Sequence, residues 1–284
     1  MQNGKSPNDT DRALRAISED GSFRLLIAST TDTAADILTR QGAHAGGRAL
    51  LADLVSGTVL LRLTMSPDYR LQGILQRDGL GSMVVDSLPD GTTRGLLRLP
   101  LDVEFPLGPP TRFSVHRQLF GGKLHQGIVE ASENQALSDV LTGYLHRSEQ
   151  IHSVVGLAHR FDDDRLQSSG GFLIQQLPEA DQATLALMTA RLESLPPATE
   201  LFATHGQDLE SLTAELFGPI DYQILGEDHF HSGCVCSVHR VVAALQTVSE
   251  EELIDLAEGD DHLTVDCEYC GASHQIPLST LRPN

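Results

Sequence analysis

The chain has 284 residues, of which 40% are hydrophobic, enough for one large domain and one or two smaller parts. It carries 20 Lys and Arg against 39 Asp and Glu, a net charge of −19, which argues against a surface that binds nucleic-acid phosphates. No apolar run is long enough to cross a membrane, and the polar residues 1–15 lack the apolar core of a signal peptide, so we expect a cytoplasmic protein.

Residues 1–179 show the pattern of one α+β domain that is built from an antiparallel sheet and helices. After the polar lead-in, a strand is predicted at 23–29, and helical patterning extends from Thr31 to about Met65. Turn signals such as Asp78-Gly79 then separate runs that read as antiparallel strands, at 69–76, 82–88, 93–99, 111–120 and 123–131. A helix over 134–150 and strands at 153–161 and 170–177 complete the predicted domain.

Residues 180–229 change character and predict a helical linker. Four apolar residues fall on one helical face: Leu185, Met188, Leu192 and Leu195. Pro196-Pro197 ends that helix, and a second amphipathic helix follows at 208–218, with Leu209, Leu212 and Leu216 on one side. Helices this short are marginally stable alone, so we expect them to dock against another part of the protein.

Residues 230–284 are predicted to form a small C-terminal module. Val238, Val241, Val242 and Leu245 make one helical face, and Ser249 to Glu252 form a capping box that starts a second helix. A strand at 263–266 leads into Cys267-Glu268-Tyr269-Cys270-Gly271, and the segment 274–278 returns from it.

All the cysteines of the chain lie in this module, in a C-x-C pair and a C-x-x-C pair that thirty residues separate: Cys234, Cys236, Cys267 and Cys270. Zn²⁺ prefers four soft ligands in a tetrahedron, and each close pair supplies two corners. In a cytoplasmic protein this spacing favours a metal site over structural disulfides. The sequence therefore predicts one zinc ion per chain, held by these four thiolates.

Two roles for such a site stay open on spacing alone. It can be a structural zinc knuckle that stabilises a module too small to fold well by itself. It can also be a redox sensor, because C-x-C and C-x-x-C can each close a disulfide ring and release the metal. Since four cysteines saturate a structural zinc, we expect surface or supporting positions for the nearby histidines, His229, His231, His239, His262 and His274.

At these residues the chain resembles the redox-regulated 33 kDa heat-shock chaperone family of bacteria. The resemblance is carried by CVCSVHRVVAALQTVSEEEL (234–253) and LTVDCEYC (263–270). It extends upstream, in the order of the family, over TRGLLRLP, QGIVEA, YLHRSEQ, GGFLIQQLP and LTAELFG. One departure is that His231-Ser232-Gly233 separates Phe230 from the first cysteine, where the family usually has a single residue.

The resemblance implies a holdase chaperone that binds unfolding client proteins without ATP and is not an enzyme. In such a protein the reduced, zinc-bound form is inactive. Oxidation forms two local disulfides, zinc leaves, the C-terminal module and the linker unfold, and the oxidised form is expected to be a homodimer. The residues that this implication assigns as both zinc ligands and redox thiols are Cys234, Cys236, Cys267 and Cys270.

Other classes of function have less support in the residues. A nucleic-acid-binding zinc ribbon conflicts with residues 230–284, which carry two arginines and nine acidic residues, a balance of −7. A thiol–disulfide oxidoreductase would place Cys267 and Cys270 in a βαβ context that the pattern lacks. A hydrolase is disfavoured because the chain has no G-x-S-x-G, H-E-x-x-H or P-loop motif.

Overall fold

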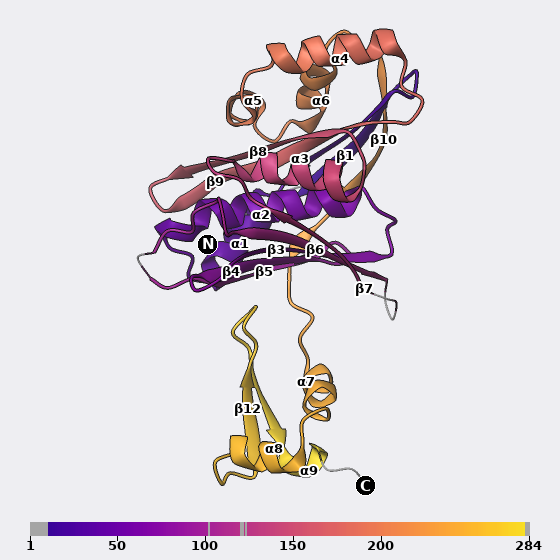
Figure 1. The fold of residues 1–284 in the computed structure, drawn as a ribbon. Coiled ribbons are helices and arrows are strands. Elements are labelled where there is room, and N and C mark those ends of the chain that lie inside the picture. Colours follow the sequence, from indigo (N-terminus) through magenta and orange to yellow (C-terminus); the bar gives the residue numbers. More distant parts are fainter. Residues whose placement is uncertain (1–10, 102, 120–121, 123, 282–284) are drawn as a thin grey trace, which may run out of the picture. The chain divides into compact units, whose positions relative to one another are not determined.

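The computed structural model describes residues 11–101, 103–119, 122 and 124–281, and they fall into two compact units that divide after Ser232 (Figure 1). The first unit holds two mainly antiparallel sheets and six helices, and the second holds a hairpin and three short helices, counted over the described residues. The α+β fold class that the sequence predicts is confirmed. No helix among the described residues is both long and apolar enough to cross a membrane.

The first sheet of the larger unit has five strands in the order β10-β1-β2-β9-β8, all paired antiparallel. Its strands are β1 (Arg12–Ser18), β2 (Phe23–Ser29), β8 (Ser153–Asp162), β9 (Arg165–Gln176) and β10 (Tyr222–His229). The second sheet has the order β11-β5-β4-β3-β6-β7. Its strands are β3 (Tyr69–Arg77), β4 (Gly81–Ser87), β5 (Thr92–Arg98), β6 (Arg112–Leu119), β7 (Leu124–Glu130) and β11 (His231–Ser232).

Helices α1 (Thr31–Arg40) and α2 (Ala45–Leu63) lie between the two sheets (Figure 1). Leucines and valines on all sides of α2 are buried, as expected for a helix that packs against a sheet on either side. The continuous helical pattern predicted from Thr31 to about Met65 is therefore two helices. The chain turns between them at Gly42, which adopts the positive φ of 54°.

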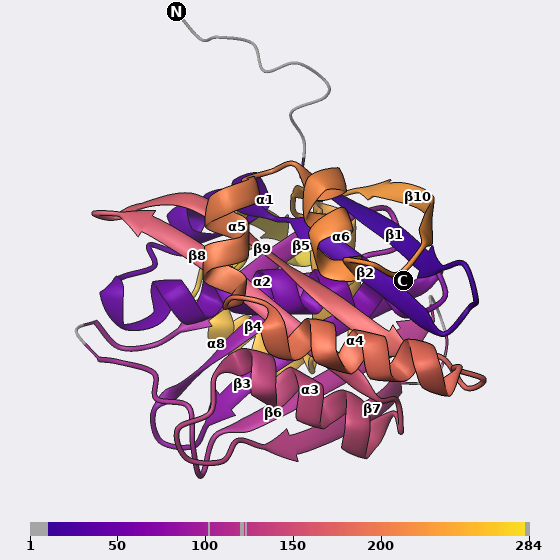
Figure 2. The same cartoon turned by 90° about the horizontal axis from the view of Figure 1, so that it is seen from above.

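The predicted linker covers the outer face of the five-stranded sheet with three helices, α4 (Gln182–Ser194), α5 (Ala198–His205) and α6 (Leu209–Phe217) (Figure 2). The apolar faces of these helices are buried against the sheet, in a cluster that includes Met188, Phe202, Leu212 and Leu216. We call this cluster the linker core. The remaining helix of the first unit, α3 (Leu137–Ser148), lies outside the linker and packs against β7 and β8.

The five-stranded sheet is apolar on both faces. In β2, Leu26 and Ala28 belong to the core around α2, whereas Leu25 and Ile27 belong to the linker core, and all four are at most 1% exposed. The same alternation in β9 places Leu173 on the α2 side. A sheet that is apolar on both sides needs a cover on both, so the linker helices are required to keep one of these faces out of water.

Strands β1 and β10 are not among the elements that the sequence predicted, and residues 12–15 belong to β1 rather than to a polar lead-in. The two strands pair with each other, and β10 is an edge strand of the sheet. The charged residues of β1 and β10, which hide their strand character in the sequence, form ion pairs across this edge, including Arg15 with Asp228 at 2.8 Å. The region 180–229 is therefore three helices followed by a strand.

The chain passes from β10 to the second sheet through a buried phenylalanine. Phe230 is 4% exposed within the core around α2, and its backbone N–H donates to the Asp11 carbonyl at 3.1 Å. His231 and Ser232 then form β11, which pairs in parallel with β5. His231 and Ser232, two of the three residues that depart from the family pattern, thus extend the second sheet, and the second unit begins at Gly233. The three-part division at 179 and 229 stays a prediction.

The second unit contains α7 (Val238–Leu245), α8 (Glu250–Leu256), the hairpin β12 (His262–Asp266) and β13 (Ser273–Pro277), and α9 (Leu278–Leu281). The predicted capping box is confirmed, because the Ser249 hydroxyl accepts from the Glu252 N–H while the Glu252 carboxylate accepts from the Ser249 N–H. The core of this unit is small, with Leu253, Ala257, Leu263, Ile276 and Leu281 as its buried residues. Such a core gives little stability without a further cross-link.

Candidate metal and thiol site

The turn of the β12–β13 hairpin presents Cys267 and Cys270. The Cys267 carbonyl accepts from the N–H groups of Cys270 at 3.2 Å and of Gly271 at 2.7 Å, and the Cys267 N–H donates to the Ala272 carbonyl at 2.9 Å. Gly271 has a φ of 71°, a conformation that residues with a side chain rarely adopt. This tight turn places both thiols on the same side of the hairpin end.

Cys234 and Cys236 lie in the extended segment just before α7. Ser237 caps this helix, because its side chain accepts from the Arg240 N–H at 3.3 Å. The helix therefore begins immediately after Cys236, which fixes where the C-x-C pair ends.

The four sulfur atoms gather into one group in which all lie within 4.8 Å of one another. The Sγ atoms of Cys234 and Cys267 are 3.6 Å apart, and those of Cys236 and Cys270 are 3.5 Å apart. A tetrahedral zinc with Zn–S bonds of about 2.3 Å separates its sulfurs by about 3.8 Å, so this arrangement is close to what the ion requires. No histidine in the described part of the chain contributes a ring nitrogen to the group.

The four thiols perturb one another strongly. Burial, together with hydrogen bonds to the neighbouring thiols Cys270, Cys234 and Cys267, raises the pKa of Cys236 to about 12. Burial also raises the pKa of Cys270. Burial opposes ionisation of Cys234 too, but the Cys236 N–H and the other thiols lower its pKa to about 7. One thiolate forms readily, and a second needs a cation nearby, which a bound metal supplies.

This arrangement supports two kinds of chemistry. The four cysteines are thiols in the structure and are all half-buried, so they can ligate a metal and are also within reach of a small oxidant. The sulfur contacts of 3.6 Å and 3.5 Å each join one motif to the other, whereas the shortest disulfide rings would lie within each motif. Proximity in the cluster therefore does not by itself select a disulfide pattern.

Sequence spacing identified all four cysteines of the group, and the structure brings all four together. It did not identify the contacts that hold the linker helices to the sheet, in particular those of Arg12, which lay in the presumed lead-in. The run RALRAIS at residues 12–18 lacks a strict apolar alternation, so its local pattern does not identify this segment as a strand.

Comparison with known proteins gives a consistent result. The family model described as "Hsp33 protein" matches residues 11–277. A 33 kDa chaperonin of Syntrophotalea carbinolica is 31% identical over 92% of this chain and 94% of its own length, and one of Geobacter sulfurreducens is 31% identical over 99% and 97%. The crystal structure of a 33 kDa chaperonin from Thermotoga maritima has the same fold, with a TM-score of 0.79 at 20% identity over 96% of each chain.

Proposed function

The chain belongs to the Hsp33 protein family, and from that premise we propose that it is a redox-regulated, ATP-independent holdase chaperone of the bacterial cytoplasm. The observation that carries the proposal is the gathering of all four thiols into one metal-sized group in the smaller unit. A second observation supports it. The linker helices cover a sheet face that would otherwise present apolar side chains to water.

In the reduced protein we propose that Cys234, Cys236, Cys267 and Cys270 hold one Zn²⁺ as thiolates. The ion would supply the cross-link that the small core of the second unit lacks, because metal-binding free energy becomes folding free energy in such modules. The cysteines would stay oxidisable, since the thiolate is the form that reacts with peroxide.

Oxidation would then close two local disulfides, Cys234 with Cys236 and Cys267 with Cys270. For each pair, an S–S bond forms as the O–O bond of one peroxide breaks, and two electrons from the thiolates with two protons convert the peroxide to two water molecules. We favour the local pairs because the short spacing within each motif gives the ring that costs least chain entropy to close. The disulfides leave too few thiolates to hold the ion.

Unfolding of the second unit would destabilise the linker. Undocking of α4–α6 would then expose both the apolar faces of these helices and the sheet face beneath them. Leu25, Phe172 and Ile174 are among the sheet residues of the linker core, each at most 5% exposed in the docked state. Contiguous apolar surface of this kind binds unfolded chains, or a second oxidised copy in the expected homodimer. The net charge of −19 would help to keep such complexes in solution.

The proposal is tested by light scattering of a thermally unfolding client protein without nucleotide. The zinc-loaded, reduced protein should suppress aggregation poorly and the peroxide-oxidised, zinc-free protein well. Reducing the oxidised sample again in the presence of zinc should restore the poor suppression, which controls for irreversible damage. Equal suppression by both forms would show a chaperone without a switch, and no suppression by either would leave the four cysteines as a structural knuckle.

A further inference from the structure

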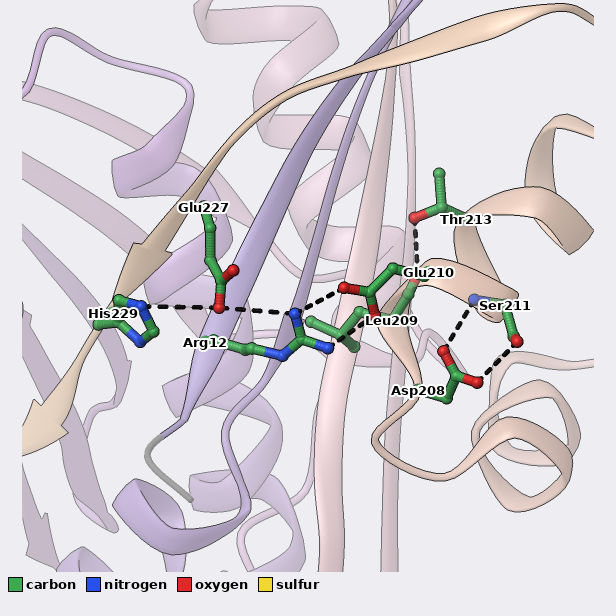
Figure 3. Close-up of polar contacts among 8 residues, drawn as sticks. All are labelled: Arg12, Asp208, Leu209, Glu210, Ser211, Thr213, Glu227 and His229. Carbon is green, nitrogen blue, oxygen red and sulfur yellow. Dashed lines mark hydrogen bonds and ion pairs between the residues drawn. The ribbon is translucent and has the colours of Figure 1, made fainter. Parts of the chain in front are cut away.

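Arg12 lies at the start of β1, between helix α6 and strand β10 of the linker region (Figure 3). Its guanidinium forms a two-pronged pair with Glu210 in the first turn of α6, with Nη1–Oε1 at 2.8 Å and Nη2–Oε2 at 2.7 Å. The same guanidinium lies 3.5 Å from Glu227 on β10. His229 approaches the same Glu227 carboxylate at 3.6 Å.

The partners of Arg12 come from both the helical and the strand part of residues 180–229. Glu210 belongs to the helix whose leucines fill the linker core, and its start is fixed by Asp208, which accepts from the Ser211 N–H at 3.0 Å. Glu227 belongs to the strand that forms the edge of the sheet. Figure 3 shows Arg12 between these two carboxylates, on a strand that stays part of the first unit.

The charges agree with the geometry. The Arg12 side chain is 24% exposed and that of Glu210 is 51% exposed, so the pair lies at the surface, where its strength depends on its two-point geometry. Its hydrogen bonds to Glu210 raise the pKa of Arg12, and the same contact lowers the pKa of Glu210. A guanidinium that holds one carboxylate at two points is a directional contact that a lysine would not reproduce.

We propose that Arg12 is a latch that couples the docking of α6 to the pairing of β10, so that the helices and the strand of the linker leave the sheet together. The inference rests on the proposed function for its consequence: the latch sets how much oxidant is needed to release the linker. Because the contact is ionic and partly exposed, salt screens it. High ionic strength therefore lowers the oxidant dose that activates the protein.

The direct test is hydrogen exchange of the reduced, zinc-loaded, full-length protein, compared among wild type, Arg12→Gln, Glu210→Gln and the double variant. Arg12→Gln should speed exchange of the amides in both α6 and β10 by about three- to tenfold, as expected for a partly exposed pair with two partners. The double variant should exchange little faster than Arg12→Gln alone, because the two side chains act through one contact. Sheet amides in β3–β6 should not change.

The matched control is Arg112→Gln, which removes a similar ion pair, with Asp78 at 2.7 Å, in the other sheet. It should leave exchange in α6 and β10 at the wild-type rate. The latch would be overturned if Arg12→Gln exchanged its amides at the wild-type rate, or if exchange became faster in α6 without any change in β10. This readout does not depend on client binding. If Arg12→Gln leaves exchange in α6 and β10 unchanged while oxidation still activates the protein, the latch alone is refuted. If Arg12→Gln speeds exchange in both elements but the protein never suppresses aggregation, the proposed function alone is refuted.

The consequence for regulation is measured as the peroxide dose that gives half-maximal suppression of client aggregation. Arg12→Gln should need less peroxide than wild type. Raising the salt from about 0.02 M to about 0.5 M should lower the dose for wild type but change it little for Arg12→Gln. An equal salt effect on both proteins would contradict a role of this ion pair in the switch.

Discussion

Substituting Leu212 by alanine should activate the chaperone without oxidation. Leu212 is on α6 and is 0% exposed within the linker core. The change deletes three carbons, a loss of about 2.4 kcal/mol at about 0.8 kcal/mol per buried methylene. The cavity left behind brings the cost of a buried Leu→Ala change to about 3–5 kcal/mol. Since about 1.4 kcal/mol is a factor of ten, the undocked fraction of the linker should rise by a factor of at least about a hundred.

The assay is suppression of client aggregation by the reduced, zinc-loaded variant, with zinc content measured on the same sample. Leu75→Ala is the matched control, because Leu75 on β3 is equally buried but belongs to the core around α2. Leu212→Ala should suppress aggregation while it keeps its zinc, and Leu75→Ala should only lower the melting temperature. If Leu212→Ala melts earlier but suppresses no more than wild type, the linker core is not the surface that docking conceals.

Three further expectations concern the thiols and one ion pair. Metal analysis of the reduced protein should give one zinc per chain, and X-ray absorption should show four sulfurs at about 2.3 Å; a nitrogen ligand would contradict the assignment. Peptide mapping after peroxide should find mainly the local disulfides, Cys234 with Cys236 and Cys267 with Cys270. A majority of disulfides between the two motifs would overturn that pairing. The hydrogen bond to Asp53, at 2.7 Å, raises the pKa of His159 above 6.5. Its stabilising effect is therefore complete below pH 6.5 and is lost as the pH rises through the folded-state pKa. His159→Gln should then cost about 1 kcal/mol in chemical denaturation at about pH 6 and much less at about pH 9, and an equal cost at both would refute this.

The four-cysteine group was predictable because its information is local. Two cysteine pairs and the glycine after the second pair identify the four candidate ligands and the turn by spacing alone. The capping box at Ser249 is local in the same sense, and the structure contains it. What spacing did not supply is how the sulfurs are arranged in the group, where Cys234 contacts Cys267 at 3.6 Å and Cys236 contacts Cys270 at 3.5 Å.

The edge of the five-stranded sheet was not predictable in this way, because β1 and β10 stabilise each other across about two hundred residues. Each strand alone reads as polar, and its charges make sense only when Arg12 meets Glu210 and Glu227, or Arg15 meets Asp228. Tertiary pairing thus overrides local pattern at this edge. The break in the helical pattern at residues 41–44 is a different case, because Gly42, which has a φ of 54°, is a local signal for the end of a helix that the reading of a continuous pattern passed over.

The central claim, that thiol oxidation releases the linker helices, is tested most directly by hydrogen exchange of the same protein before and after peroxide. Amides of the second unit and of α4–α6 should lose protection on oxidation, whereas those of α2 and β3–β6 should keep it. Loss of protection confined to residues after Gly233, with α4–α6 as protected as in the reduced protein, would contradict it.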